Sequence, residues 1–197
     1  MRPDRNARPE YVTAFRELAA RICSALEGSP KRVLPVKMYV AGGAAIHLYT
    51  GARVSKDVDA VFSHRIALPA NLEISYRDAD GAARLLYFDH QYNDTLALMH
   101  EDAHEDSHAL SLDGIDPAVL DVRLLSPVDL AVTKIGRFLD HDRQDIIALA
   151  RRRLIRPEPL RRRAEEALGG YVGNTDWVRG SIQMACRIVA DEQARAG

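Results

Sequence analysis

The chain has 197 residues, of which 47% are hydrophobic and 28% are charged. This composition excludes intrinsically disordered, collagen-like and coiled-coil proteins, and the length suffices for one large core or two small ones. Lysine and arginine total 27 against 28 aspartate and glutamate residues, and the formal net charge of -1 argues against a whole-surface electrostatic grip on nucleic acid. With two cysteines and no long apolar run, we expect a cytoplasmic protein without a membrane segment.

The first predicted elements are a helix, a strand and a second helix. Residues 2–8 are polar and predict a frayed arm. Apolar residues then recur at helical spacing from 12 to 26, and residues 33–40 are typical of a strand. This strand leads into the pair Gly42 and Gly43, after which residues 44–50 predict a short helix.

A sheet with antiparallel strands is predicted next. Residues 56–62 alternate between polar and apolar side chains, as a strand does. Two further strand-like runs, 72–76 and 84–88, are separated by turn-forming residues around Gly81, which indicates a hairpin. Residues 120–125 form one more short apolar run.

The remainder of the chain predicts helices. Ser126, Pro127 and Asp129 supply the N-cap, the first-turn proline and the capping-box acid of a helix, and helical patterns continue to the end of the chain. We therefore expect an α/β (α+β) fold, in which residues 1–125 form a mixed sheet flanked by helices and residues 126–197 form a helical C-terminal region.

Two aspartates within an otherwise apolar strand are the sharpest chemical feature. Asp57 and Asp59 are two residues apart, so their carboxylates share one face of a strand. Burying a carboxylate is costly without a partner, and Mg²⁺ prefers one or two carboxylates together with substrate phosphates. The pair therefore indicates a metal site, and the alternative is an edge strand with an acidic, water-facing side.

The glycine pair stands upstream of these aspartates, with thirteen residues between Gly43 and Asp57. Glycines between a strand and a helix let a ligand approach the backbone closely, and the first N–H groups of the helix face an anion. The pattern indicates a phosphate-binding turn beside a metal site. The alternative is a tight turn with close packing of strand and helix.

In order and spacing, the glycine and aspartate pairs resemble the signature of the nucleotidyltransferase superfamily typified by DNA polymerase beta. Within it, the chain is similar to the bacterial AbiEii-like proteins of abortive-infection and toxin-antitoxin systems, which share a later block like residues 125–146. The resemblance covers about residues 37–154. It implies an enzyme that uses Mg²⁺ or Mn²⁺ to transfer a nucleoside monophosphate from an NTP to an acceptor hydroxyl, releasing pyrophosphate.

The resemblance also implies a third metal-binding carboxylate on a later strand. Asp89 is the first choice, because the strand before it precedes the one that leads into Ser126. Asp121 is the rival and Asp94 ranks third. A fold of this kind without the third carboxylate could bind a nucleotide without transferring it.

Further nucleotide-binding residues follow from the same resemblance. Lys134 resembles the family lysine that reaches the triphosphate, Arg137 could join it, and Ser55 joins Gly42 and Gly43. The alternative for Lys134 is a solvated side chain on an amphipathic helix. Nearby acids, Asp142 and Asp145, are expected to hold the basic groups through short-range ion pairs.

Two charged segments permit a binding interpretation and a simpler one. His100, His104 and His108 would form one stripe on a helix and could bind a metal, although a polar, water-facing segment is the favoured interpretation. Residues 151–163 contain seven arginines and one acid. They could contact an RNA, tRNA or protein acceptor, or they could form a solvated face that pairs with the acidic middle of the chain.

A second class of function stays open beside the enzyme. The fold could serve as a non-catalytic binding protein, a toxin-antitoxin component that recognises a partner protein or RNA. A metal-dependent glycosyltransferase is disfavoured, because the chain is short for such a fold together with an acceptor site.

Overall fold

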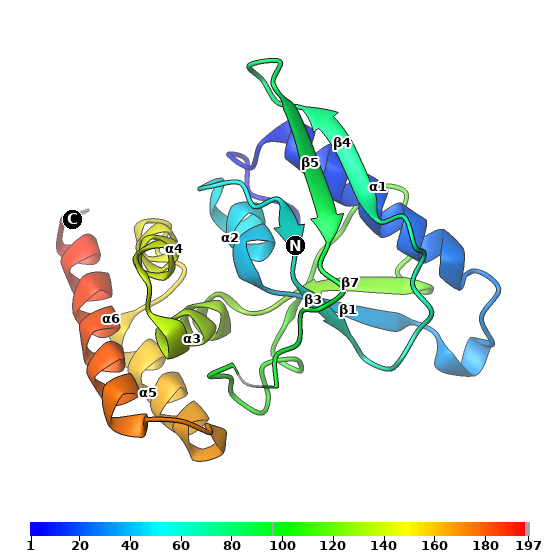
Figure 1. The fold of residues 1–197 in the computed structure, drawn as a ribbon. Coiled ribbons are helices and arrows are strands. Elements are labelled where there is room, and N and C mark those ends of the chain that lie inside the picture. Colours follow the sequence, from blue (N-terminus) through cyan, green and yellow to red (C-terminus); the bar gives the residue numbers. More distant parts are fainter. Residues whose placement is uncertain (96, 196–197) are drawn as a thin grey trace. The chain divides into compact units, whose positions relative to one another are not determined.

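The computed structural model describes residues 1–95 and 97–195, and the chain divides into two compact units. The first unit comprises Met1–Asn93 and Ser107–Leu124, and the second comprises Asp94–Asp106 and Leu125–Gly197. The strands belong to the first unit, and the helices from α3 (Pro127–Arg137) onward belong to the second (Figure 1). The predicted mixed α/β fold with a helical C-terminal region is confirmed.

The first unit contains two mixed sheets rather than one. The four-stranded sheet has the order β3-β1-β7-β6, in which β1 runs parallel to β7 and antiparallel to β3. The three-stranded sheet has the order β2-β5-β4, in which β5 runs parallel to β2 and antiparallel to β4. The strand bounds are β1 Val36–Val40, β2 Asp57–Val58, β3 Ala60–Phe62, β4 Glu73–Arg77, β5 Ala83–Phe88, β6 His108–Ala109 and β7 Leu120–Leu124.

The predicted strand over residues 56–62 is two strands in different sheets. Asp57 and Val58 pair with β5, whereas residues 60–62 pair with β1, and Asp59 lies between them. The backbone crosses between the sheets here, since the Val58 carbonyl accepts from Asp89 N at 3.1 Å and the Asp59 carbonyl accepts from Ala41 N at 2.8 Å. Both aspartates therefore lie where the two sheets meet.

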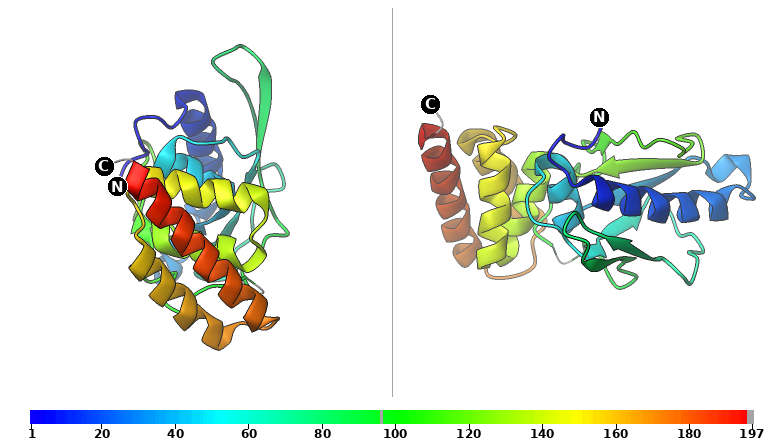
Figure 2. Two further views of the ribbon diagram at one scale, coloured as in Figure 1. Left: turned by 90° about the vertical axis from the view of Figure 1, so that its left-hand side faces the viewer. Right: turned by 90° about the horizontal axis from the view of Figure 1, so that it is seen from above.

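Helix α1 (Pro9–Leu26) packs against β4, β5 and β7, and Figures 1 and 2 show it lying beside β4 and β5. Its buried face includes Tyr11, Phe15, Leu18 and Ile22, which recur at the spacing expected for the core side of a helix. The predicted helix is thus confirmed, and it begins three residues earlier because Pro9 occupies its first position.

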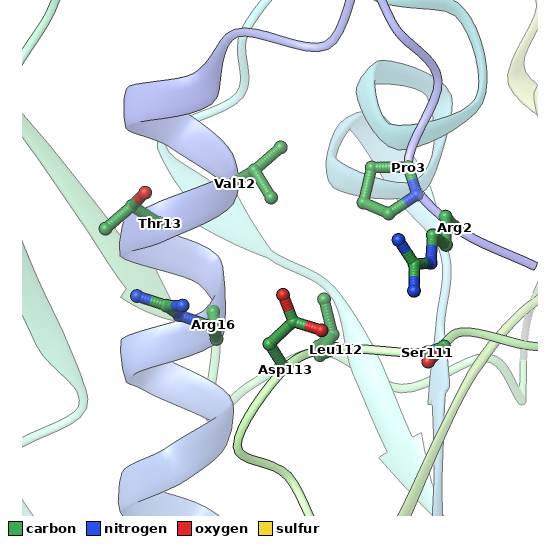
Figure 3. Close-up of a pocket in the computed structure, with 8 residues that line it drawn as sticks. All are labelled: Arg2, Pro3, Val12, Thr13, Arg16, Ser111, Leu112 and Asp113. Carbon is green, nitrogen blue, oxygen red and sulfur yellow. The ribbon is translucent and has the colours of Figure 1, made fainter.

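The predicted frayed arm over residues 2–8 is wrong, because this segment is held on the first unit by hydrogen bonds. Asp4 N donates to the Leu48 carbonyl at 2.8 Å, and Arg8 N donates to His47 Nε2 at 3.0 Å. Figure 3 shows the segment beside α1, around a pocket of about 120 Å³ lined by Arg2, Pro3, Val12, Thr13, Arg16, Ser111, Leu112 and Asp113. Composition alone could not reveal these partners, because they are distant in sequence.

The second unit is helical. Ser126 caps α3 as predicted, since its hydroxyl accepts from Asp129 N at 3.2 Å. Pro157 occupies the first position of α5 (Pro157–Ala167), whereas the preceding helix α4 (Asp140–Arg151) ends six residues before it. Among the helices of the described chain, none is long and apolar enough to cross a membrane. The remaining helices are α2 Gly42–Thr50, α3 Pro127–Arg137, α4 Asp140–Arg151, α5 Pro157–Ala167 and α6 Thr175–Arg195, with short 3-10 turns at Lys31–Val33 and Leu168–Gly170.

Candidate functional site

The end of β1 brings the first glycine against the second aspartate. Helix α2 begins at Gly42, whose φ of 59° lies in the left-handed region that favours glycine. A Cβ added to Gly42 would lie 1.9 Å from Asp59 Oδ2, which is closer than any van der Waals contact. The Asp59 carboxylate therefore lies directly against the backbone of the first turn of α2, and only glycine permits this approach.

The second glycine also has close neighbours, although less close than those of Gly42. A Cβ on Gly43 would lie 2.8 Å from Ser55 Cβ and 3.0 Å from Arg53 Nη1. Ser55 is buried, and its hydroxyl donates to Asp57 Oδ1. Ser55 thus joins the glycine turn to the first aspartate, and Arg53 brings a cation to the same turn.

Opposite charges meet at this turn. The first N–H groups of α2 have no acceptor within the helix, and the helix dipole places roughly half a positive charge at this end. Arg53 adds a full positive charge beside Gly43, while Asp57 and Asp59 supply two negative charges. The turn can therefore bind an anion such as phosphate, and the aspartates can bind a cation that accompanies it.

Tyr11 adds a buried hydroxyl from α1. Its ring meets the His47 ring edge-on at a centroid distance of 4.7 Å. Burial raises the pKa of the Tyr11 phenol, and the charges of Tyr76, Asp57 and Asp59 raise it further, so the phenol stays neutral. Within the described residues this hydroxyl has no hydrogen-bond partner, which leaves an unused donor near the aspartate pair.

Asp57 and Asp59 are suited to a divalent cation. Both are half-buried, and two carboxylates completed by phosphate oxygens form a set of hard oxygen donors that Mg²⁺ accepts. Across residues 1–95 and 97–195, no three His, Cys, Asp or Glu side chains gather closely enough to hold a metal ion. The residues present fit a cation that is bound together with a nucleotide, and the third carboxylate is not assembled with them.

Asp89 lies one position beyond the paired part of β5. Asp57 pairs with Tyr87 and Val58 pairs with Phe88, so the next positions along the two strands are Asp59 and Asp89. Asp89 Oδ1 accepts from Gln91 N at 2.8 Å. This register favours Asp89 among the three carboxylates considered for the third ligand.

Asp121 and Asp94 lie elsewhere. Asp121 pairs with Lys37 on β1, four residues before Ala41, which corresponds to about 13 Å along a strand. Its carboxylate accepts from Arg123 Nη1 at 3.1 Å. Asp94 belongs to the second unit, where its Oδ2 lies 2.9 Å from His104 Nε2 and this contact lowers the pKa of Asp94.

Lys134 and Arg137 belong to an ion-pair cluster of the second unit, in which Lys134, Asp142 and Asp145 are buried and Arg137 is exposed. Lys134 Nζ lies 3.1 Å from Asp145 Oδ2 and 3.6 Å from Asp142 Oδ1, and Arg137 donates to both oxygens of Asp142. Burial acts to raise the pKa of Asp142, but the hydrogen bonds from Arg137 and from Leu139 N hold it below its ordinary value. The expected ion pairs are present, and they account for the burial of Lys134 without a nucleotide.

The histidines do not share a helix. In the second unit, His100 precedes and His104 lies within the turn of residues 101–106, whereas His108 begins β6 in the first unit. The helical stripe considered from the sequence is therefore wrong, because tertiary contacts decide the conformation of this acidic segment.

Several arginines of residues 151–163 form ion pairs within the second unit. Arg163 donates to Asp129 and to Asp106, each at 2.7 Å, and Arg151 donates to Glu192 at 2.8 Å. Arg161 pairs with two acids of its own helix, Glu158 and Glu165. These contacts support the interpretation of this segment as a charged face that is compensated internally.

A protein family described as nucleotidyltransferase of unknown function (DUF6036) matches residues 20–177 of the chain. The chain belongs to this family. Its matched range contains the glycine turn, both aspartates and Asp89, and it confirms the nucleotidyltransferase superfamily expected from the sequence. The searches of curated proteins and of solved structures returned no match.

Among the site residues of this nucleotidyltransferase, Arg53 and Tyr11 are not foreseen from the sequence. The one sequence signal for Arg53 is its position in the loop between α2 and β2, four residues before Asp57. Tyr11 occupies a helical core position like its apolar neighbours, and nothing local marks its hydroxyl.

Proposed function

We propose that this member of the nucleotidyltransferase family transfers a nucleoside monophosphate from an NTP to a hydroxyl of an RNA, tRNA or protein acceptor and releases pyrophosphate. One observation carries the proposal: the Asp59 carboxylate packs against Gly42 in the first turn of α2. This contact joins a phosphate-binding helix N-terminus and a metal-binding aspartate pair into one site, as transfer from a metal-bound nucleotide requires.

The binding roles follow from the chemistry of each group. The N–H groups of Gly42 and Gly43 and the Arg53 guanidinium would hold the triphosphate, while Asp57 and Asp59 would hold Mg²⁺ or Mn²⁺. When bound, the cation neutralises charge on the phosphates and lowers the pKa of the acceptor hydroxyl. Ser55 keeps Asp57 oriented by donating to its Oδ1.

The proposed reaction is a substitution at the α-phosphorus of the NTP. The acceptor oxygen forms a bond to the α-phosphorus, and the bond from that phosphorus to the oxygen bridging to the β-phosphate breaks. Pyrophosphate leaves with that oxygen, and the hydroxyl proton would pass to the carboxylate of Asp89, whose backbone N donates to the Val58 carbonyl next to Asp59. Positioning of the two oxygens in line supplies most of the acceleration in such reactions.

Calorimetric titration with each NTP in the presence of Mg²⁺ tests the site. Asp57→Asn and Asp59→Asn are expected to weaken NTP binding by at least about tenfold, the scale of one lost charged contact. Asp121→Asn removes the same charge on β7 and is expected to leave NTP affinity unchanged. Equal NTP affinity in all three variants and the native protein would contradict the site.

Within residues 1–95 and 97–195, Asp89 does not gather with Asp57 and Asp59 into a group of three metal-binding side chains, and this favours a second candidate. In this alternative the protein is a non-catalytic, AbiEii-like component of a toxin-antitoxin system that binds a partner protein or RNA in the cytoplasm. It predicts a stoichiometric complex with the product of a neighbouring gene. Affinity purification that recovers no stoichiometric partner would count against it.

A further inference from the structure

A pocket of about 320 Å³ opens beside Asp89 in the first unit. Rings line much of it, although Phe, Trp and Tyr make up only 6% of the chain. The Phe62 and Phe88 rings are stacked with centroids 5.7 Å apart, and the His90 ring meets Phe88 edge-on at 5.2 Å. Its lining residues are Ala60, Val61, Phe62, His64, Arg65, Ile66, Leu68, Phe88, Asp89, His90 and Tyr92.

Charged and polar groups also line this pocket. Asp89 is the single acidic residue and Arg65 the single arginine among its lining residues, while His64 and His90 contribute exposed imidazole rings. A ligand that suits these walls carries a flat ring for the aromatic side chains and an anionic group for Arg65. Its volume is at the lower end of the ~300–1,000 Å³ typical of small-molecule sites, which limits the ligand to about one nucleoside.

Asp89 connects this pocket to the proposed reaction. It lines the pocket, and its backbone N donates to the Val58 carbonyl at 3.1 Å, so the Asp89 backbone lies beside the peptide that joins Val58 to Asp59. A ligand in the pocket can therefore present a hydroxyl to the carboxylate that the proposed function assigns as proton acceptor.

We propose that this pocket binds the acceptor, and that the acceptor is a nucleoside carrying a 5′-phosphate, either free or at the end of an RNA strand. The base would stack on Phe62 and His90, the phosphate would meet Arg65, and a ribose hydroxyl would face Asp89. This inference rests on the proposed function for the role of the ligand, but binding itself can be measured without any transfer.

The test uses the full chain without NTP or metal. Equilibrium dialysis measures binding of adenosine 5′-monophosphate, and fluorescence anisotropy measures binding of a short single-stranded RNA labelled at its 5′ end. Phe62→Leu removes the stacking surface but stays apolar, and it is expected to weaken probe binding by about tenfold, the scale of one lost base-aromatic contact. Arg65→Gln is expected to weaken binding and to lower the salt slope of RNA binding by about one. Arg32→Gln, an exposed arginine outside the pocket, is the charge-matched control.

The binding measurements on the pocket variants either support or overturn this inference. Weaker probe binding in both pocket variants, with unchanged NTP titrations, supports it, and the probe that binds identifies a free nucleotide or a strand end as the source. Unchanged probe binding in the pocket variants, or no binding of either probe to the native chain, overturns it. A parallel loss of NTP affinity in Phe62→Leu also overturns it, because the pocket would then hold the donor. Failure of the proposed function would instead appear in the Asp57 and Asp59 titrations.

Discussion

Gly42→Ala tests the contact on which the proposed site depends. The added Cβ would lie 1.9 Å from Asp59 Oδ2, whereas ordinary contacts begin near 3.4 Å, so the carboxylate would have to move by about 1.5 Å. The φ of 59° adds strain, because a left-handed conformation costs about 1–2 kcal/mol for a residue with a Cβ. Alanine offsets up to about 1 kcal/mol of this cost, because it lowers the conformational entropy of the unfolded chain.

These effects can be combined with the cost of overpacking, which is about 1–3 kcal/mol in a well-packed site. The net loss is about 2 kcal/mol, equivalent to a fall in Tm of about 4–8 °C for a chain of this size. Beyond this loss of stability, the displaced Asp59 carboxylate is expected to reduce the affinity for Mg²⁺-bound NTP.

Gly51→Ala separates the functional effect from the structural one. Gly51 also has a positive φ, 68°, and a Cβ there would lie 2.3 Å from the Asn6 carbonyl oxygen, away from the aspartate pair. Urea unfolding is expected to show destabilisation in both variants, and calorimetric titration is expected to show lost NTP affinity in Gly42→Ala alone. Native NTP affinity in Gly42→Ala would refute the packing of Asp59 against the helix N-terminus as the basis of the site.

Three further predictions concern stability, each measured by urea unfolding. The buried His47 ring accepts from Arg8 N and contacts the Ala52 carbonyl through Nδ1, and burial lowers the pKa of this ring. As the pH falls, the unfolded chain therefore binds the proton before the folded chain does. The free energy of unfolding should fall by up to ~1 kcal/mol between about pH 7 and about pH 5.5. The variant His47→Gln should lose this pH dependence of stability, and a variant that kept it in full would contradict its assignment to His47. Lys134→Met removes the buried cation that faces the Asp142 and Asp145 carboxylates and should cost about 3–5 kcal/mol. Arg143→Met, which removes one partner of an exposed pair, should cost less than about 1 kcal/mol, and equal costs of the two variants would contradict this difference. Tyr11→Phe removes a buried hydroxyl without a partner in the described chain and should stabilise by about 1 kcal/mol, so a loss of stability would reveal a partner.

Elements with local chemical signals could be predicted from the sequence. The periodicity of α1, the turn between β4 and β5, and the capping residues of α3 each act within a few neighbouring residues, and each is confirmed. The order of the glycine and aspartate pairs likewise predicts one site, and the structure brings Gly42 and Asp59 together.

Features that depend on distant partners could not be predicted. Alternation over residues 56–62 indicates extended backbone but not which sheet each half joins, so the break at Asp59 depends on β1 and β5. The segment Asp94–Asp106 joins the second unit through contacts such as the ion pair between Asp106 and Arg163, which are 57 residues apart. The ring-lined pocket beside Asp89 combines residues from two stretches that show no shared motif.

Transfer of label from an NTP tests the proposed activity most directly. The native protein and the Asp57→Asn/Asp59→Asn double variant would each be incubated with Mg²⁺, bacterial RNA and protein, and NTPs labelled at either the α- or the γ-phosphate. We predict that α-label enters a discrete RNA or protein band with the native protein alone, while γ-label is released as pyrophosphate. Absence of α-label from every band, with the fold intact, would contradict nucleotidyl transfer, and γ-label in a band would indicate phosphoryl transfer instead.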